Sequence, residues 1–412
     1  MKKSAVAVAS LLSVSLVGFF TGVLHSELGL SVSMSFSLLA LGATVRPSSY
    51  SGEKGRLVLA VAGGTGVVFV TYLTDIPTVV AVVSVSAVVV GEAGATVLDG
   101  ISEGTLFFVV GGGTAGGVAG YLATGTSTAV VVAVVALAVF AGATARSVGA
   151  SLWLTVVVTA FGGWLATLVV EPSASVVFVG GAAVFVVALA VGAYIDDAMD
   201  VSGASAGALL SYVVLVAGGI VWFFVLAVFV ATGSATTRYG LDEKEEMGIA
   251  DHDEGRGFKN VAANGAVAFV AVVVYAVSSS FVVESVAALG FVGCMATATA
   301  DTASSEIGTV AGGEPRLITT LERVPPGTDG GVSWQGELIT LVASVVVGIV
   351  AYAIGFLTVE YAAVAAFGGI VGAHADSLLG ATLEGKYLDN EGVNLSACAV
   401  GAVTAGAVGY LL

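Results

Sequence analysis

The chain has 412 residues, of which 57% are hydrophobic and 10% are charged. Soluble domains carry roughly 25% charged residues, so this composition excludes an ordinary water-soluble protein. The 13 Lys and Arg residues against 29 Asp and Glu residues give a net charge of −16, which argues against nucleic acid or anionic lipid headgroups as partners. Abundant carboxylates with few Lys residues are also typical of a halophilic source.

Apolar runs of about 17–20 residues, long enough to cross the hydrocarbon core of a bilayer, recur along the whole chain. We expect each run to be a helix, because irregular backbone cannot face lipid. The clearest runs are Ala5–Leu24, Leu57–Leu73, Thr128–Ala143, Leu152–Val170, Val176–Tyr194 and Leu338–Phe356. Hydropathy therefore predicts an all-α, polytopic transmembrane protein of the cell membrane, with about 12–15 crossings.

The first apolar run follows Met1, Lys2 and Lys3, a beginning that a secretory signal peptide shares. No small-x-small cleavage site follows before His25, and further spans come after it, so we interpret this run as a retained first helix. Residues 1–199 as a whole form a predicted N-terminal transmembrane region, for which the sequence indicates no role.

The glycine-rich stretch GGGTAGGVAG at 111–120 contains G-x-G-x-x-G. No strand is predicted before it, so we do not expect it to bind a dinucleotide. Its glycines instead have the small-xxx-small spacing that lets membrane helices approach closely, in the pairs Gly113/Gly117 and Gly116/Gly120.

Residues 200–412 form the second predicted domain, which carries three polar loops at 238–260, 301–337 and 376–394. The apolar blocks between these loops are each long enough for two crossings, which return the chain to the side that it left. All three loops should therefore share one face of the membrane. Because Lys and Arg residues cluster in these loops, the positive-inside rule predicts that this face is cytoplasmic.

In the first loop, four side-chain donors fall on one face if a helix begins near Gly255. They are Arg256, Lys259, Asn260 and Asn264. Cations and amides at the mouth of a helix suit phosphate oxygens, so this stripe is a predicted phosphate-binding surface. The alternative is that the two cations only fix the topology and that Asn264 packs between helices.

The second loop begins with ATADTASSEIGTV at 298–310, where ionisable groups directly follow an apolar run. On a helix Asp301 and Ser305 share a face, whereas Glu306 points elsewhere. An ionisable side chain at membrane depth costs roughly 2.5–3.5 kcal/mol, which makes a functional role the default interpretation. This argument applies to Asp301, and the predicted catalytic residues of this stretch are Asp301, Ser305 and Glu306.

The same loop continues with RVPPGTDGGVSWQGE at 323–337, whose two adjacent prolines stop any helix. Glycines let backbone N–H groups turn toward an anion, and the predicted phosphate-binding residues here are Gly327, Gly330, Gly331 and Ser333. Asp329 lies among them and is a candidate Mg²⁺ ligand, because Mg²⁺ prefers a few carboxylates with substrate oxygens. The alternative is a plain cytoplasmic turn.

In the third loop Asp376 and Ser377 again place an acid and a serine at the end of an apolar run. The nearby GATLEGKY matches G-x-x-x-x-G-K, but Tyr387 stands where a P-loop needs Ser or Thr, and a helix precedes it, so we reject that interpretation. If Asp301, Asp329 and Asp376 converge, they form a Mg²⁺ site beside a lipid substrate.

Five stretches of the second half also carry a resemblance to a known family. They are DVSGASAGALL (200–210), GRGFKNVAANG (255–265), ADTASSEIGTV (300–310), PPGTDGGVSWQGE (325–337) and DSLLGATLEGKY (376–387). In this order they resemble the membrane proteins of domain-of-unknown-function family ninety-two, which include plant phytyl-phosphate kinase. That family is distantly similar to CTP-dependent polyprenol kinases, to whose conserved elements DTASSEIG and GGVSWQGE would correspond.

The resemblance implies a membrane kinase that transfers the γ-phosphoryl group of a nucleoside triphosphate, such as CTP, to a prenyl monophosphate. The three aspartates would hold Mg²⁺, while Arg256, Lys259 and the Gly327–Gly331 turn would bind phosphates. Two other functions stay open: a transporter or lipid flippase without nucleotide chemistry, and a structural membrane protein whose loops only bind a partner.

Overall fold

The computed structural model describes residues 76–95, 104–106, 108–124, 126–150, 152–240, 243–244, 256–311 and 313–412. The predicted retained first helix and the run Leu57–Leu73 lie outside these residues. Among the described residues, nine helices are long and apolar enough to cross a membrane, and three shorter apolar helices accompany them. The predicted all-α, polytopic membrane fold is confirmed, while the predicted 12–15 crossings include spans outside the described residues.

The chain folds into two compact units, Met1–Tyr212 and Val213–Leu412. The described elements of the first unit are α4 (Thr78–Ala95), the π-helix η2 (Phe108–Gly112), α6 (Gly113–Thr124), α7 (Thr128–Ser147), α8 (Leu152–Val169), α9 (Val176–Ile195) and α10 (Val201–Val213). The domain boundary predicted between residues 199 and 200 lies just before α10 and stays a prediction.

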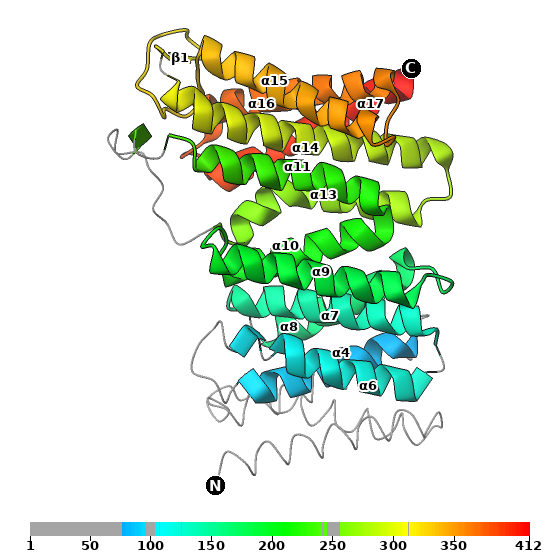
Figure 1. The fold of residues 1–412 in the computed structure, drawn as a ribbon. Coiled ribbons are helices and arrows are strands. Elements are labelled where there is room, and N and C mark those ends of the chain that lie inside the picture. Colours follow the sequence, from blue (N-terminus) through cyan, green and yellow to red (C-terminus); the bar gives the residue numbers. More distant parts are fainter. Residues whose placement is uncertain are drawn as a thin grey trace. The chain divides into compact units, whose positions relative to one another are not determined.

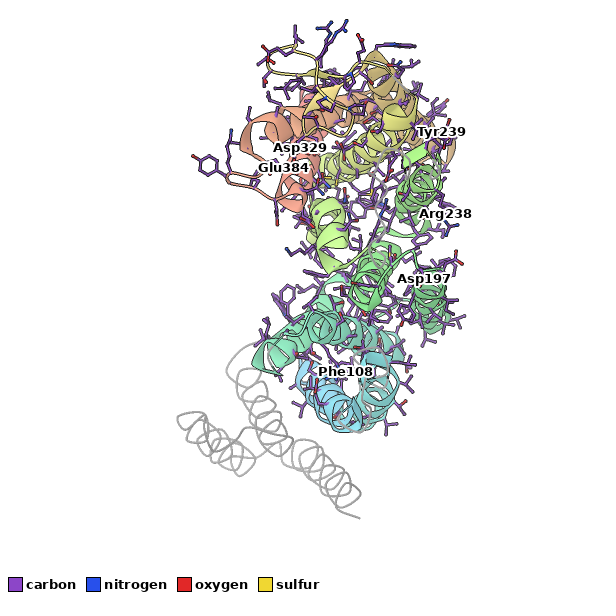
Figure 2. All side chains as sticks on the ribbon, turned by 90° about the vertical axis from the view of Figure 1, so that its left-hand side faces the viewer. Phe108, Asp197, Arg238, Tyr239, Asp329 and Glu384 are labelled. Carbon is purple, nitrogen blue, oxygen red and sulfur yellow. The ribbon has the colours of Figure 1, made fainter. Side chains whose placement is uncertain are left out.

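Within the first unit α7 packs against α4, α6, α8 and α9. Arg146 Nη1 near the end of α7 donates to both carboxylate oxygens of Glu92 in α4 at 2.8 Å, so Glu92 has a partly buried basic partner. The Phe108 ring is fully buried in the same unit (Figure 2). A Cβ added to Gly142 of α7 would lie 2.8 Å from that ring, so a glycine is needed there.

The glycine spacing of α6 serves helix packing for one of the two predicted pairs. A Cβ added to Gly116 or Gly120 would lie 3.2 or 2.8 Å from Val83 of α4. In the other pair, Gly113 would meet only Val139 at 4.0 Å, and Gly117 would meet nothing within 4 Å. The pair Gly116/Gly120 therefore lets α4 and α6 approach closely, as the spacing predicts.

The second unit is a helix bundle with one small antiparallel ladder. Its elements are the π-helix η3 (Val214–Gly218), α11 (Ile220–Thr237), α13 (Phe258–Val277), α14 (Phe281–Val310), β1 (Arg316–Leu317), β2 (Gly331–Val332), α15 (Trp334–Ala353), α16 (Val359–Leu383) and α17 (Asn390–Leu411). In the ladder Arg316 pairs with Val332 and Leu317 with Gly331. Ser333, Thr358 and Asp389 accept backbone hydrogen bonds as the N-caps of α15, α16 and α17.

Helix α14 is the centre of this bundle and packs against α11, α13, α15, α16 and α17 (Figure 1). Small residues bring its neighbours close. A Cβ added to Gly293 of α14 would lie 2.7 Å from Ala405 of α17, and one added to Gly369 of α16 would lie 2.6 Å from Ala296 of α14. The bundle is thus held by close backbone packing, which suits helices surrounded by lipid.

An aromatic cluster ties α11 to the bundle. The Trp222 ring of α11 lies 4.7 Å from the rings of Tyr275 and Phe291 and 5.0 Å from the ring of Phe356. Tilted aromatic pairs at such distances are worth about 0.5–1.5 kcal/mol beyond their area burial. This cluster lies near the start of α11. The opposite end of the helix lies beside the polar loops.

The three polar loops meet at one end of the second unit, because α13 with α14 and α15 with α16 form the two predicted return crossings. Helix α14 is 30 residues long, and Asp301 lies about 30 Å along it at 1.5 Å per residue. That distance equals the thickness of a bilayer's hydrocarbon core. If the hydrocarbon core begins at Phe281, Asp301 lies at its far boundary.

Replacing Gly368 of α16 by Val should lower the melting temperature of the purified protein in detergent. An added Cβ would lie 2.7 Å from the Gly401 carbonyl oxygen and 2.9 Å from the Ala405 Cβ of α17. Overpacking of this kind costs about 1–3 kcal/mol. Gly192→Ala is the matched control, since an added Cβ there meets nothing within 4 Å. Equal melting temperatures of the two variants would contradict this packing.

Candidate functional site

A polar cavity of about 380 Å³ opens among α13, α14, α15, α16 and α17 at the end of the second unit that carries the polar loops. All but one of the predicted site residues line it. They are Arg256, Asn260, Asn264, Asp301, Ser305, Glu306, Gly327, Asp329, Gly330, Gly331, Ser333 and Asp376. The predicted convergence of the three polar loops at one face is therefore what the geometry shows.

The centre of the cavity is a pair of acids from two neighbouring helices. The carboxyl groups of Asp301 in α14 and Asp376 in α16 lie at hydrogen-bonding distance from each other. Two carboxylates in contact cannot both stay ionised unless a proton or a cation lies between them. The Asp376 Oδ1 atom is buried and, within the described part of the chain, has no hydrogen-bond partner. Asp376 thus presents one unsatisfied carboxylate oxygen at the cavity.

The third aspartate shares the cavity without completing a compact cluster. Asp329 lines the cavity and is close enough to influence Asp376 electrostatically. Among the described residues, however, no group of three or more His, Cys, Asp or Glu side chains is placed to hold a metal ion by itself. Mg²⁺ usually takes only one or two protein carboxylates and fills its octahedron with water and substrate phosphates. The donor set therefore fits Mg²⁺ with Asp301 and Asp376 as direct ligands.

The glycine turn before β2 brings Asp329 to the two acids. Gly330 has φ +72°, and a Cβ added there would lie 2.5 Å from the Ser377 carbonyl oxygen and from the Ala381 Cβ. Only glycine allows this left-handed backbone to rest directly on α16. Figure 2 shows Asp329 beside Glu384, which follows the last turn of the same helix. The turn is a wall of the cavity.

Arg256 and two amides form the opposite wall. Helix α13 begins at Phe258 rather than near Gly255, so Arg256 precedes the helix, and its Nη2 donates to Thr237 Oγ1 of α11 at 2.7 Å. Asn260 and Asn264 lie one turn apart on the face of α13 that lines the cavity.

Lys259 is the one predicted site residue that the structure does not bring to the cavity. Its side chain is 74% exposed and lies 3.9 Å from Asp389. At 3.6 residues per turn Lys259 lies about 140° around α13 from Asn264, so it does not share the face that lines the cavity, and Arg256 precedes the helix. The predicted four-residue stripe is therefore wrong.

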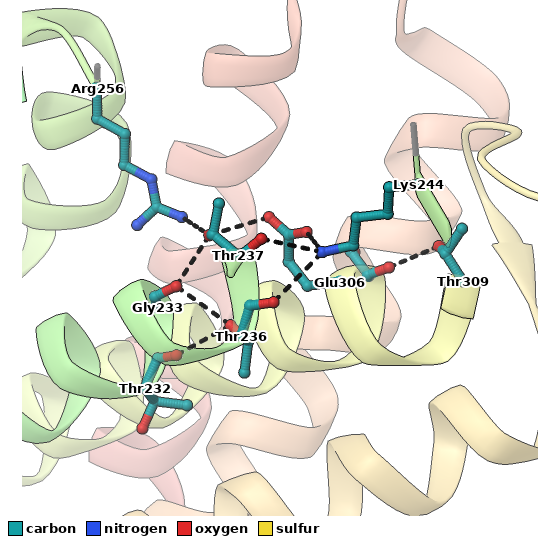
Figure 3. A network of polar contacts seen from close by, with 9 residues as sticks. Thr232, Gly233, Thr236, Thr237, Lys244, Arg256, Glu306 and Thr309 are labelled. Atoms are coloured by element: carbon teal, nitrogen blue, oxygen red, sulfur yellow. Dashed lines mark hydrogen bonds and ion pairs between the residues drawn. The ribbon is translucent and has the colours of Figure 1, made fainter. Parts of the chain in front are cut away.

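The remaining predicted residues occupy the edges of the cavity. The Ser333 hydroxyl accepts a hydrogen bond from the Gly336 backbone N–H at 3.1 Å, as the N-cap of α15. Ser305 is exposed along α14. Both carboxylate oxygens of Glu306 have partners, Thr237 Oγ1 at 3.1 Å and Lys244 Nζ at 2.6 Å (Figure 3). Glu306 thus faces α11 while it still lines the cavity.

The cavity also contains residues that the sequence did not single out. They are Glu337, His374, Glu384, Asn390 and Asn394. His374 Nε2 lies 2.9 Å from Glu337 Oε2 while its Nδ1 lies 2.8 Å from the Ile370 carbonyl oxygen, so both ring nitrogens face acceptors. The i, i+4 spacing of the two asparagines at the start of α17 repeats that of α13 and was a usable signal. No signal in the sequence distinguished His374.

Carboxylates outnumber cationic groups in the cavity. The acids that line it are Asp301, Glu306, Asp329, Glu337, Asp376 and Glu384, against Arg256 and His374. A phosphate group would be repelled by this lining unless a cation accompanied it. An anionic ligand would therefore enter with a divalent cation, and the paired aspartates are the natural place for it.

Comparisons with known proteins match the part of the chain that contains this cavity. The family described as integral membrane protein DUF92 matches residues 184–407. This region contains all five stretches on which the resemblance depends, which confirms it. No solved structure matches the chain.

Relatives come from distant organisms. The uncharacterized membrane protein MJ0933 of Methanocaldococcus jannaschii is 34% identical over 206 residues, 50% of this chain and 83% of the relative. The uncharacterized membrane protein sll0875 of Synechocystis is 34% identical over 192 residues, 43% of this chain and 73% of the relative. The chloroplastic protein VTE6 of Arabidopsis thaliana is 31% identical over 214 residues, 50% of this chain and 64% of the relative.

Replacing Glu384 by Gln should raise the melting temperature in neutral and alkaline solution but not in acid. Burial and the nearby carboxylates, Asp329 first among them, raise the pKa of Glu384 above its ordinary value of 4.5. A carboxyl group whose folded-state pKa is raised costs no stability below its unfolded pKa and most above its folded pKa. Thermal unfolding at about pH 4 and about pH 8 measures the difference.

Glu322→Gln is the control, because Glu322 is exposed and does not line the cavity. A lower melting temperature of Glu384→Gln at the alkaline pH would contradict the crowding of carboxylates described for the cavity.

Proposed function

The chain belongs to the DUF92 family of integral membrane proteins, and we propose that it is a prenyl-phosphate kinase whose reaction takes place in the polar cavity. One observation supports this most directly. Paired carboxyl groups, an arginine, amides and a glycine turn, which come from segments far apart in the sequence, line a single cavity at the end of a membrane helix bundle. These are the groups that phosphoryl transfer requires, since catalysis there is mostly positioning and charge neutralisation.

In this proposal each wall of the cavity has a separate task. Asp301 and Asp376 would hold Mg²⁺, which neutralises phosphate oxygens and bridges them when it is bound. Arg256 would bind a phosphate oxygen of the substrate, and the amides of Asn260 and Asn264 would donate to neighbouring oxygens. The backbone of the Gly327–Gly331 turn would contact the phosphates from the opposite side.

The proposed reaction joins two phosphates and needs no strong base. An oxygen of the prenyl monophosphate forms a bond to the γ-phosphorus of the nucleoside triphosphate, while the bond from that phosphorus to the bridging oxygen breaks. The products are a prenyl diphosphate and a nucleoside diphosphate. Because the attacking oxygen already carries negative charge, no residue has to remove a proton from it. His374, with both nitrogens engaged, is not required as a base.

The surroundings of the cavity suit an acceptor with an apolar tail. On α15, Glu337 lines the cavity, and the next residue, Leu338, is 51% exposed. Leu341 and Val342 continue this exposed apolar face away from the cavity. A prenyl chain in the bilayer would lie along such a face with its phosphate group in the polar cavity. The proposal places the cavity on the cytoplasmic side, where the loop cations point by the positive-inside rule and where nucleotides are available.

The family resemblance adds to this physical argument, because the family includes plant phytyl-phosphate kinase. CTP is the nucleotide that the more distant polyprenol kinases suggest. The rival function, a transporter or flippase, would use the same acids along a water-filled path without nucleotide turnover. The two functions differ in one product, a prenyl diphosphate.

The purified protein with Mg²⁺, CTP or ATP, and geranylgeranyl phosphate should form geranylgeranyl diphosphate, measured by mass spectrometry. Asp301→Asn and Asp376→Asn should each lower turnover on the order of 10³-fold, because each removes a ligand of the proposed cation and several kcal/mol of charge stabilisation.

Asp197→Asn is the matched control. Asp197 is exposed at a turn with φ 53°, a conformation that Asn tolerates, and it does not line the cavity (Figure 2). The proposal fails if the wild-type protein forms no diphosphate with any nucleotide, or if both cavity variants turn over as fast as Asp197→Asn.

A further inference from the structure

Lys244 is a buried cation beside the cavity, with a side chain that is 6% exposed. Lys is almost never buried without a partner. Its Nζ donates to Glu306 Oε2 at 2.6 Å and to the carbonyl oxygens of Thr236 and Thr237 at 3.3 and 3.2 Å (Figure 3). One ammonium group therefore caps the last turn of α11 and neutralises an acid of α14 at the same time.

Two described residues of this segment, Gly240 and Lys244, contact each other, and Gly240 packs on α14. The Lys244 N–H donates to the Gly240 carbonyl oxygen at 3.0 Å. Gly240 has φ +63°, and a Cβ added there would lie 2.6 Å from a Val310 methyl group at the end of α14. A side chain is excluded at this position, so the turn after α11 rests on α14 and carries Lys244 to Glu306.

A continuous series of contacts leads from Lys244 to Arg256. Thr237 Oγ1 accepts from Arg256 Nη2 at 2.7 Å, and its single proton can go to Glu306 Oε1 at 3.1 Å or to the Gly233 carbonyl oxygen at 2.9 Å. The order of contacts is Lys244, Glu306, Thr237 and Arg256 (Figure 3). One hydroxyl group thus joins the guanidinium group of Arg256 to an acid that Lys244 has already neutralised.

Helix α11 also makes room for the guanidinium group. A Cβ added to Gly233 would lie 2.9 Å from Arg256 Nη1. The guanidinium therefore lies against the helix at Gly233, held on one edge by Thr237. Arg256 lines the cavity, and among the described residues its side chain makes one hydrogen bond, to Thr237, so its other N–H donors have no acceptor within this part of the chain and can serve an anion.

The charges explain why the lysine is needed. Glu306 and Arg256 both contact the Thr237 hydroxyl, so without Lys244 the Glu306 carboxylate would attract the guanidinium group directly. An arginine paired with a cavity acid is unavailable to a phosphate group. A lysine that neutralises Glu306 removes this competition.

We infer that Lys244 is a positioning residue: it occupies Glu306 and so keeps Arg256, held by Thr237, oriented toward an anionic group of the substrate. This inference rests on the proposed function only in taking that group to be a phosphate. Lys244 touches neither substrate nor reacting atoms, and its effect passes entirely through Glu306 and Thr237.

Lys244→Met should raise the KM for geranylgeranyl phosphate, and the Kd for the same lipid measured without nucleotide, on the order of tenfold, because the lipid phosphate would lose a hydrogen bond from the charged Arg256 guanidinium group. Lys244→Arg should keep most of the affinity. Thr237→Val, which removes only the hydroxyl group, should raise KM similarly. Lys386→Met is the control, because Lys386 is exposed and, among the described residues, its side chain hydrogen-bonds to the Thr382 carbonyl oxygen at 3.4 Å and to no carboxylate.

The double variant Lys244→Met with Glu306→Gln separates positioning from simple destabilisation. With the competing carboxylate gone, Arg256 should again be available, and affinity should return toward that of the wild type even if the melting temperature stays low. No rescue in the double variant, or an unchanged Kd in Lys244→Met, would overturn the inference. If the wild-type protein binds the lipid phosphate but forms no diphosphate, the kinase proposal fails while these Kd values still test Lys244. A wild-type protein that does not bind the lipid phosphate overturns both.

Discussion

The contact between the Asp301 and Asp376 carboxyl groups is the interaction on which the interpretation of this protein depends. Helices α14 and α16 pack closely along most of their length, with Gly369 against Ala296 leaving no space for a side chain. This packing forces the two acids together where the helices leave the apolar layer. While the two carboxyl groups stay in contact, the electrostatic cost must be met by a proton or a cation. A cation explains more than a proton does, because the surrounding polar groups and the two acids would then bind the same ligand.

The charges around this pair favour a ligand that combines a cation with an anionic group. The lining is acidic, with Arg256 as its permanent cation, and a bare phosphate would find little attraction. A phosphate bound together with Mg²⁺ is different, because the metal satisfies the aspartates and the arginine satisfies the remaining oxygens. Lys244 also affects the charge of the cavity. It neutralises Glu306 from outside the cavity and so leaves Arg256 for the ligand.

Much of this arrangement could be predicted from the sequence, because it depends on hydropathy along the chain, on the number of crossings and on the spacing of residues within one helix. Hydropathy identified the helices, and counting crossings between Val261 and Ala375 placed the three polar loops at one end. Helical spacing correctly paired Asn260 with Asn264 on the cavity wall. It failed for the four-residue stripe, because Arg256 precedes α13 and Lys259 lies about 140° around the helix from Asn264.

The rest of the site depends on tertiary contacts that no periodicity expresses. Lys244 lies in the run LDEKEE, which looks like a solvated charged loop, and only the packing of Gly240 on Val310 carries it to Glu306. His374 of α16 contacts Glu337 of α15, and these two residues are well separated in the sequence although their helices are consecutive. The close contact of two aspartates, rather than a compact set of three, likewise follows from the packing of α14 on α16.

The most direct measurement is the position of a bound metal ion. Crystals or a frozen sample of the protein prepared with Mn²⁺ in place of Mg²⁺ would show the ion by its anomalous scattering or its paramagnetic effect on nearby groups. This account predicts one Mn²⁺ ion between the carboxyl groups of Asp301 and Asp376. The same two groups joined by a proton, with no metal ion bound at millimolar Mn²⁺ and with a prenyl phosphate present, would contradict it.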